Sequence, residues 1–434
     1  MFTALQDPLV EEGLRQQLDL IVREITRTYG SQCTIVLAGG FGRGEGSIRF
    51  TESNSPVPLH DFDLYVIAER VTDSRTHELM ERRILDQLAT LTGLNFEEEN
   101  FVVGVEAIPR GSLRRLPPDL SAYEMKAASV ILHGPDLRHH IPLTSWDVTP
   151  ASGAITLFHR ATALLKNVQP EYLEQGEFPP DRRLEAVYEC CKVYTEICTA
   201  LSLIGGFYEP SYSSRARKLE SHFHKFPELQ KQIPDLPEKV RLHTQMKLES
   251  DFRRIIERPR ESWTVARRCL DVSLRYFMHK FLGTRFQQRW PDLCFEAERT
   301  FNSMLFHDYL AYYLRRLGIR GQTFVNAANA VFQVYDSVSF RRRVHRLGRN
   351  VRGASWSVCS PLQHIYLSSA LVLMSLKDNG TVDDSLLGLG RSYLGRVFYP
   401  VGDSSGVESW KMERDRCVEA QRLYFVVKQQ KTVL

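Results

Sequence analysis

The segment DFDLYVIA, residues 61–68, opens with two carboxylates, Asp61 and Asp63. Side chains alternate across a strand, so these two lie on the same face if the segment is a strand. Two neighbouring carboxylates repel each other, and a cation between them removes that repulsion. Mg²⁺ prefers oxygen ligands and often takes only one or two carboxylates together with the phosphates of a substrate. The pair therefore predicts one half of a metal-dependent phosphate site.

A glycine-rich segment, AGGFGRGEG at residues 38–46, precedes this pair in the chain. Glycine is entropically costly in a folded chain, so this density of glycine needs a structural cause. We expect a buried strand to end at Ala38 and a helix to begin near Gly42, which would present backbone N–H groups to an anion. Arg43 adds a guanidinium suited to phosphate. Glu45 is either a local ion-pair partner of Arg43 or a residue whose role the sequence does not assign.

Three well-known glycine motifs do not fit this spacing. A P-loop requires GxxxxGK[ST], but the residue after Gly44 is Glu45. The dinucleotide fingerprint GxGxxG fails because Gly40 and Gly42 are followed by Glu45 at the third glycine position. A protein kinase would need a lysine-bearing strand and the HRD and DFG motifs, which the sequence lacks.

Together, the segments LAGGFGRGEG and HDFDLYVIA resemble the nucleotidyltransferase superfamily related to DNA polymerase β, over roughly residues 30–135. The nearest likeness is to bacterial nucleotidyltransferase-domain proteins with a GGxGRGEG loop. The resemblance implies that Gly39 and Gly40 form the glycine signature of the family. It also implies that Asp61 and Asp63 are the two metal-binding aspartates.

The family takes a third carboxylate from a later strand, and Glu106 in the segment VVGVEAI is the candidate. The family usually has aspartate at this position, and an alternative alignment places Gly104 there. Gly104 and Glu106 share strand parity, so Glu106 can still face the metals. The gap between Gly40 and Asp61 is longer than usual for the family, because the segment RFTESNSPVPL is inserted.

The chemistry implied by the resemblance is two-metal transfer. Mg²⁺ (or Mn²⁺) ions held by Asp61, Asp63 and Glu106 would bridge an acceptor hydroxyl and the α-phosphate of a nucleoside triphosphate, and pyrophosphate would leave. The two signature glycines and Arg43 would cradle the β- and γ-phosphates. The acceptor, a hydroxyl or phosphate on a small molecule, a protein or a nucleic-acid end, is not readable from the sequence.

Two alternative functions stay open. The first is a nucleotide second-messenger synthase of the same superfamily, which would use a second nucleotide as acceptor. The second is a catalytically degenerate nucleotidyltransferase fold that serves as a binding protein or antitoxin.

Other residues are weaker candidates for contacts with substrate. Relatives often close their first helices after the catalytic core over the nucleotide, so a tyrosine such as Tyr212 would stack on the base and Lys192 or Arg215 would touch phosphates, unless these residues serve ordinary packing and surface charge. Lys126, expected on a helix near the third strand, has either a phosphate role or a solvent-exposed position. The basic run RRRVHRLGRNVR, residues 341–352, suits an anionic acceptor, a nucleic acid or another partner, or is a solvated helix face.

The order of the expected elements predicts an α+β protein with a small mixed-sheet domain at residues 1–145 and two helical regions at 150–255 and 260–434. Helices are expected at 9–29 and 74–92, the latter capped by Asp73 or Ser74 and stopped by Gly93. Strands are expected at CTIVLAGG, DFDLYVIA and NFVVGVEAI. The proline-containing segments RFTESNSPVPLH and KFPELQKQIPDLPEK are expected to be loops.

The composition is that of an ordinary globular protein. Hydrophobic residues make up 43% and charged residues 25% of 434 residues, and the net charge of +4 does not by itself imply nucleic acid. The eight cysteines are scattered without zinc-site spacing, which favours reduced, mostly buried thiols and a cytoplasmic location. The N-terminus has no signal-peptide pattern, and no apolar run reaches the length of a transmembrane helix.

Overall fold

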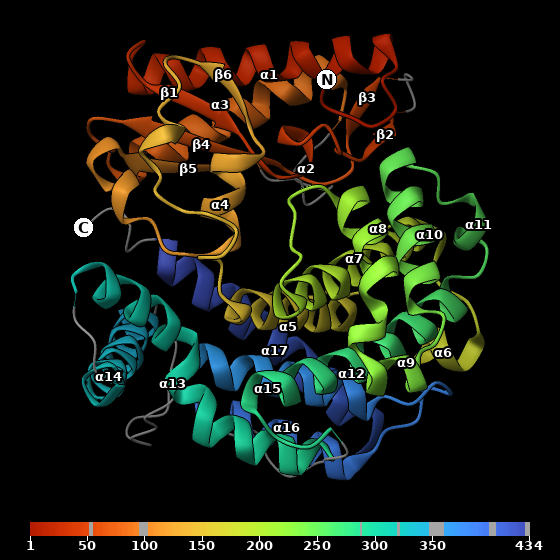
Figure 1. Ribbon diagram of the computed structural model, residues 1–434. Coiled ribbons are helices and arrows are strands. Elements are labelled where there is room, and N and C mark those ends of the chain that lie inside the picture. Colours follow the sequence, from red (N-terminus) through yellow and green to blue (C-terminus); the bar gives the residue numbers. More distant parts are fainter. Residues whose placement is uncertain are drawn as a thin grey trace.

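The computed structural model describes residues 1–51, 55–94, 103–286, 289–318, 322–346, 360–398 and 405–429. A small sheet with its helices forms one end of the molecule, and a larger helical region forms the other (Figure 1). The predicted α+β class is confirmed.

Four strands form the main sheet, in the order β5-β4-β1-β6. The strands are β1 (Thr34–Leu37), β4 (Phe62–Ala68), β5 (Val103–Pro109) and β6 (Val130–His133). β1 runs antiparallel to β4 and β6, whereas β4 and β5 are parallel, so the sheet is mixed. The sequence predicted the first three of these strands but no strand at β6.

One face of the sheet is covered by α1 (Pro8–Tyr29) and α3 (Ser74–Thr92). Figure 1 shows α1 along the outer side of the sheet, away from the helical region. The ends of α3 follow the prediction: the side chain of Asp73 accepts a hydrogen bond from Thr76 N, and Gly93 ends the helix in the left-handed conformation. The opposite face of the sheet packs against α4 (Leu120–Ala127) and points toward the helical region.

The segment between the glycine turn and β4 differs from the prediction of a loop. Its described parts form β2 (Ile48–Phe50) and β3 (Pro56–Pro58), which pair antiparallel with Arg49 opposite Val57. A two-stranded ribbon tolerates prolines, because it has outer edges where a missing N–H donor costs no ladder hydrogen bond. The loop prediction was therefore wrong here.

The rest of the described chain is helical. The helices are α5 (Pro150–Lys166), α6 (Pro170–Gln175), α7 (Pro180–Gly205), α8 (Tyr212–His222), α9 (Pro227–Gln232), α10 (Leu236–Glu249), α11 (Arg253–Ile256), α12 (Pro259–Leu282), α13 (Trp290–Arg316), α14 (Gln322–Arg346), α15 (Pro361–Ser375), α16 (Asp384–Leu394) and α17 (Gly406–Gln429). Short 3₁₀ helices occur at Arg110–Arg115, Arg138–His140 and Phe223–Lys225. One hydrophobic core extends from Ala154 on α5 to Tyr424 on α17, so the two predicted helical regions share it.

The segment KFPELQKQIPDLPEK was predicted as a loop and is instead mostly helical. It contains α9 and the start of α10, and Pro227 and Pro237 lie in the first turns of these helices. A proline in the first turn loses no helical hydrogen bond, because the N–H groups there have no partner within the helix. Counting prolines as helix breakers therefore failed at this place.

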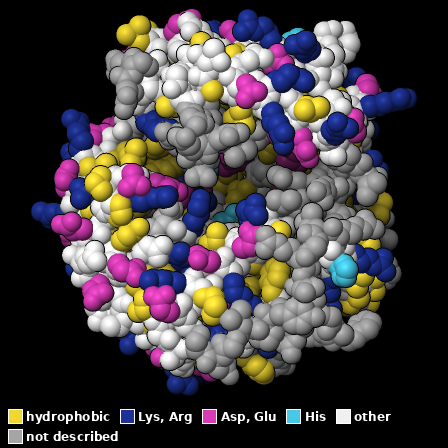
Figure 2. Space-filling view, turned by 180° about the vertical axis from the view of Figure 1, so that it is seen from behind, with side chains coloured by type: hydrophobic (Ala, Val, Ile, Leu, Met, Phe, Trp, Pro, Cys, Tyr) yellow, Lys and Arg dark blue, Asp and Glu magenta, His cyan; other side chains and the backbone are white. Residues whose placement is uncertain are grey.

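Several coarse expectations can be compared with the described residues. The seven described cysteines are buried and not in disulfides, as predicted. Within the described ranges, no helix combines the length and the apolar character needed to cross a membrane. Basic and acidic side chains intermingle over the described part of the face in Figure 2. The basic run 341–352 begins on α14, and its residues 347–352 lie outside the described ranges.

Candidate functional site

The glycine turn is packed directly against Asp63. α2 (Gly39–Gly42) is a single turn that begins at Gly39, three residues earlier than expected, and Gly39 has a φ of 60°. A Cβ atom at this position would lie 1.8 Å from Asp63 Oδ2. Ala38 N also donates a hydrogen bond to the carbonyl oxygen of Asp63 at 2.9 Å. Only glycine fits between the turn and this carboxylate.

Asp61 and Asp63 are adjacent carboxylates with opposite pKa shifts. Burial, reinforced by the negative charge of Asp61, raises the pKa of Asp63 to about 6 against the opposing charge of Arg43. Burial also acts to raise the pKa of Asp61, but a hydrogen bond from His60 and the charges of His60 and Lys192 outweigh it and lower that pKa. The Asp63 carboxylate opens onto a cavity. Positive charge added beside Asp63 would lower its pKa again.

Glu106 does not lie opposite Asp63. In the parallel pairing of β4 with β5, Gly104 is opposite Asp63 and Glu106 is opposite Tyr65. Glu106 shares the face of Asp63 but is two residues further along the strand. Among the residues that the structure describes, no three His, Cys, Asp or Glu side chains are grouped to hold a metal ion. The structure thus brings two of the three predicted metal ligands together.

Two carboxylates still fit a magnesium ion that arrives with a nucleotide. Mg²⁺ retains several waters and is commonly bound by one or two carboxylates and by substrate phosphates. Burial and the negative charge of Asp61 raise the pKa of Asp63, and a bound cation would oppose both effects by favouring the charged carboxylate. Asp61 and Asp63 are the residues that would hold it.

A cavity of about 250 Å³ lies beside Asp63, between the sheet domain and the helical region. Five of the residues predicted from the sequence line it, namely Gly39, Gly40, Arg43, Asp63 and Tyr212. Arg215, which the sequence suggested as an alternative to Lys192 for a phosphate contact, lines it as well. The residues that sequence reasoning did not place there are Ala38, Tyr65, Leu120, Ser121, Glu124, Thr156, Glu196 and Thr199. Residues of α4, α5, α7 and α8 therefore line the same cavity as the glycine turn.

Glu124 on α4 joins the glycine turn to α8 through a buried ionic network. Its carboxylate accepts hydrogen bonds from Arg43 and from the hydroxyl of Tyr208, and it lies 3.4 Å from Arg215 Nη1. The side chains of Arg43 and Arg215 are 4% and 2% exposed, so neither guanidinium is in contact with bulk water. Burial alone would lower the pKa of Arg43, but the charge of Glu124 outweighs it and raises that pKa.

Glu45 acts across the domain interface, beyond its local contact with Arg43. Its carboxylate accepts hydrogen bonds from Ser211 Oγ at 2.7 Å and from Tyr212 N at 2.9 Å, and Arg43 Nε is 3.4 Å away. Glu45 therefore caps the N-terminus of α8, where unpaired backbone N–H groups favour an anion. This role was missed because its partners lie more than 160 residues away in the sequence.

Tyr212 is surrounded by cations. The guanidinium of Arg43 lies 4.5 Å from the ring centroid, that of Arg215 lies 4.7 Å away, and Lys247 Nζ lies 4.7 Å away. Such cation–π contacts use the faces of the ring that a stacking base would need. The predicted stacking of a nucleobase on Tyr212 thus competes with these contacts, and the ring instead holds positive charge beside the cavity.

The two predicted lysines lie in different surroundings. Lys192 Nζ is 3.5 Å from Glu189 Oε1, and its charge acts on both Asp61 and Asp63. Lys126 Nζ donates a hydrogen bond to the carbonyl oxygen of Leu143 at 2.8 Å and does not line the cavity. The charge of Lys192 therefore acts on the two aspartates of the site. Lys126 instead anchors the segment around Leu143, which follows the last strand of the sheet.

Lys247 on α10 is a buried lysine that no sequence pattern singled out. It is 4% exposed, and its Nζ donates a hydrogen bond to Ser47 Oγ at 3.2 Å. Burial and the charges of Arg43 and Lys192 lower the pKa of Lys247 to about 7. A lone lysine on a helix has no local pattern that distinguishes it from a surface residue, so tertiary packing alone reveals it.

We expect Lys247→Met to raise the melting temperature most at pH 7 and below. The folded protein releases this proton near pH 7, whereas the unfolded chain keeps it to about pH 10.4. Between these values the unfolded state binds more protons, so wild-type stability rises with pH and the advantage of methionine shrinks. Melting curves from pH 6 to 9.5 measure this difference, and the exposed Lys225→Met is the control. A constant difference between Lys247→Met and wild type across that range would contradict the low pKa.

Comparisons of this chain with protein-family models, curated proteins and solved structures find no significant match. The functional assignment of the site therefore depends on its residues and their geometry.

Proposed function

We propose that the protein is a nucleotidyltransferase that binds a Mg²⁺–nucleoside triphosphate between the glycine turn and Asp63. The observation that carries the proposal is the contact between Gly39 and the Asp63 carboxylate at the edge of a cavity lined by Arg43 and Arg215. A backbone turn that offers N–H groups beside a carboxylate, with cations nearby, matches the needs of a metal-bound polyphosphate.

The reaction would transfer a nucleoside monophosphate group to an acceptor. The acceptor oxygen forms a bond to the α-phosphorus, the bond from that phosphorus to the bridging oxygen breaks, and pyrophosphate leaves. A metal ion bound with the nucleotide would act as a Lewis acid on the phosphate oxygens. Gly39 and Gly40 would position the phosphates, and Asp61 and Asp63 would hold the metal ion beside those phosphates. The positive charges of Arg43 and Arg215 favour an anionic ligand, and their ion pairs with Glu124 hold both guanidinium groups in place.

A second candidate function is nucleotide-dependent binding without transfer. In the family that the sequence resembles, the third acid is expected to be the base for the acceptor hydroxyl. In this chain the residue opposite Asp63 is Gly104. This register supports a fold that binds a nucleotide or a partner but transfers no phosphoryl group. Synthesis of a nucleotide second messenger remains an alternative with the same carboxylates.

A metal and nucleotide titration tests binding. We expect Mg²⁺ with a nucleoside triphosphate to raise the melting temperature, because a ligand that binds only the folded state stabilises it. Asp61→Asn and Asp63→Asn should abolish this shift, whereas Asp86→Asn, an exposed position on α3, should keep it. The absence of any shift with wild type, or its retention in the two site variants, would exclude the proposed site.

Transfer is tested separately with an α-labelled nucleoside triphosphate. Pyrophosphate release with label on an acceptor supports the nucleotidyltransferase. Labelled oligonucleotides formed without an acceptor support the second-messenger synthase. Saturable binding with neither product, across a panel of the four nucleotides and candidate acceptors, supports the binding function.

A further inference from the structure

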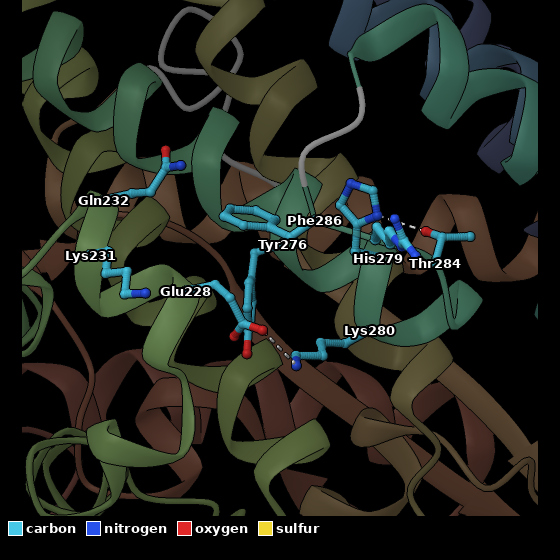
Figure 3. A pocket seen from close by; sticks show the side chains of 9 residues that line it. Glu228, Lys231, Gln232, Tyr276, His279, Lys280, Thr284 and Phe286 are labelled. Carbon is cyan, nitrogen blue, oxygen red and sulfur yellow. Dashed lines mark hydrogen bonds and ion pairs between the residues drawn. The ribbon is translucent and has the colours of Figure 1, made fainter.

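A second cavity, of about 560 Å³, lies in the helical region between α9 and the C-terminal end of α12 (Figure 3). It shares no lining residue with the cavity at the glycine turn. Its volume falls within the range of about 300–1,000 Å³ that small-molecule sites occupy. Nothing in the proposed nucleotidyl transfer uses it.

Three residues that line this cavity each carry a buried polar atom with no hydrogen-bond partner among the described residues: Tyr276 Oη, His279 Nε2 and Glu228 Oε2. Tyr276 is 0% exposed and His279 is 1% exposed. Buried polar atoms in native proteins are nearly always paired, so several orphans around one cavity need an explanation. A bound ligand would explain them if it donated a hydrogen bond to the Glu228 carboxylate and also bonded with the Tyr276 hydroxyl and the His279 imidazole.

His279 is held in one orientation with its outer nitrogen unused. Its Nδ1 lies 2.6 Å from Thr284 Oγ1, and Figure 3 shows the imidazole beside this threonine at the edge of the cavity. Burial and the charge of Arg275 lower the pKa of His279 to about 4, so the imidazole is neutral at neutral pH. A neutral imidazole bonds through one nitrogen as donor or acceptor, which suits a hydroxyl group.

The charged side chains of the cavity lining are mainly basic. Lys231, Lys280 and Arg285 contribute three cations against the single carboxylate of Glu228. Lys280 Nζ lies 3.6 Å from Glu228 Oε1, which leaves two cations without that neutralising contact. The excess positive charge favours an anionic group on the ligand.

Aromatic rings form the apolar wall. The ring of Phe286 meets the ring of Tyr276 edge-on at 5.2 Å and that of His279 at 5.7 Å. Figure 3 shows Phe286 and Tyr276 together at the centre of the cavity lining, with Lys231 on one side and His279 on the other. A sugar or a heterocycle can pack against such a wall while its polar groups reach the atoms described above.

We propose that this pocket binds a small organic phosphate that carries hydroxyl groups. The phosphate lies toward Arg285, one of the cations of the lining, and the hydroxyl groups bond with Tyr276, His279 and Glu228. A sugar phosphate and a nucleoside monophosphate share this chemistry. The inference does not depend on nucleotidyl transfer at the glycine turn.

Isothermal titration of the full-length protein with glucose 6-phosphate, AMP and inorganic phosphate tests the proposal. We expect saturable binding of at least one of the two organic phosphates, and weaker binding of inorganic phosphate, which lacks the hydroxyl groups. Tyr276→Phe should weaken binding about three- to tenfold, the effect of one lost hydrogen bond. Arg285→Ala should weaken it by at least tenfold, because a charged contact is lost.

The matched control is Tyr366→Phe. Tyr366 is also fully buried with a hydroxyl that has no partner in the described part of the chain, but it does not line this cavity. The Tyr366→Phe variant should bind both organic phosphates with the affinity of the wild-type protein. Without ligand, Tyr276→Phe should melt at or above the wild-type temperature, because it removes an unpaired buried group.

Three outcomes would overturn the proposal. One is the absence of saturable binding by either organic phosphate. Another is equal affinity in Tyr276→Phe, Arg285→Ala and wild type. The third is a lower melting temperature of unliganded Tyr276→Phe, which would mean that the hydroxyl is already paired in the folded protein. AMP binding that disappears in Gly39→Ala but not in Tyr276→Phe belongs to the glycine turn and counts against this pocket.

Discussion

Gly39→Ala is expected to abolish the thermal shift by Mg²⁺–nucleotide and to lower the stability of the protein. The new Cβ would lie 1.8 Å from Asp63 Oδ2 and 2.8 Å from Asp63 Cγ, so either the carboxylate or the turn must move. Alanine must also adopt a φ of 60°, which costs about 1–2 kcal/mol for a residue with a side chain. Both effects move the backbone N–H groups of the turn away from the Asp63 carboxylate. The proposed ligand needs these two groups side by side.

A double-mutant cycle distinguishes the clash from backbone strain. In an Asp63→Ala background the carboxylate is absent, so Gly39→Ala should cost only the strain of its left-handed backbone. The difference between the two backgrounds, measured from urea-unfolding midpoints, reports the contact itself. Gly111→Ala is the control, because a Cβ there meets no atom within 4 Å. Equal costs in both backgrounds, or normal nucleotide binding by Gly39→Ala, would contradict the packing of the turn against Asp63.

The elements predicted correctly are those whose signals are local. Asp73 and Gly93 mark the two ends of α3 by their own side-chain and backbone preferences. The pairing of Asp61 with Asp63 follows from the alternation of a single strand, and the glycine turn follows from the density of glycine. These signals sufficed to locate a candidate site but not to complete it.

The missed features depend on partners that are distant in the sequence. Glu45 bonds to residues 211–213, and Glu124 bonds to Tyr208 and Arg215. Neither carboxylate lies in a pattern that differs from that of a surface residue. The register of β5 against β4 likewise decides whether Gly104 or Glu106 is opposite Asp63, and two residues of equal strand parity cannot be distinguished by alternation.

Proline was the least reliable local signal. Pro56 and Pro58 lie in a two-stranded ribbon, and Pro227 and Pro237 lie in the first turns of helices. In each case the missing N–H falls where no ladder or helical partner is required. The position of a proline within its element decides its effect, and that position is known only once the element is known.

The carboxylate of Glu124 is expected to be the largest electrostatic contributor to the interface between the sheet domain and α8. Glu124→Gln would leave Arg43 and Arg215 buried with less compensating negative charge, and only Glu45 would remain beside Arg43. Removal of one partner from a buried ion pair costs about 3–5 kcal/mol. We therefore expect a clear fall in the urea-unfolding midpoint, together with weaker Mg²⁺–nucleotide binding, because the carboxylate of Glu124 no longer holds Arg215 at the cavity.

Glu69→Gln is the matched control. Glu69 pairs with Arg110 at 3.1 Å, but their side chains are 76% and 50% exposed, so solvent screens the pair and its loss should cost at most about 1 kcal/mol. The same chemical change thus produces a large effect only where the arginines are buried. A midpoint for Glu124→Gln equal to that of Glu69→Gln would mean that the network does not stabilise the interface. A lower midpoint with unchanged nucleotide affinity would mean that it stabilises the fold without positioning Arg215 for the ligand.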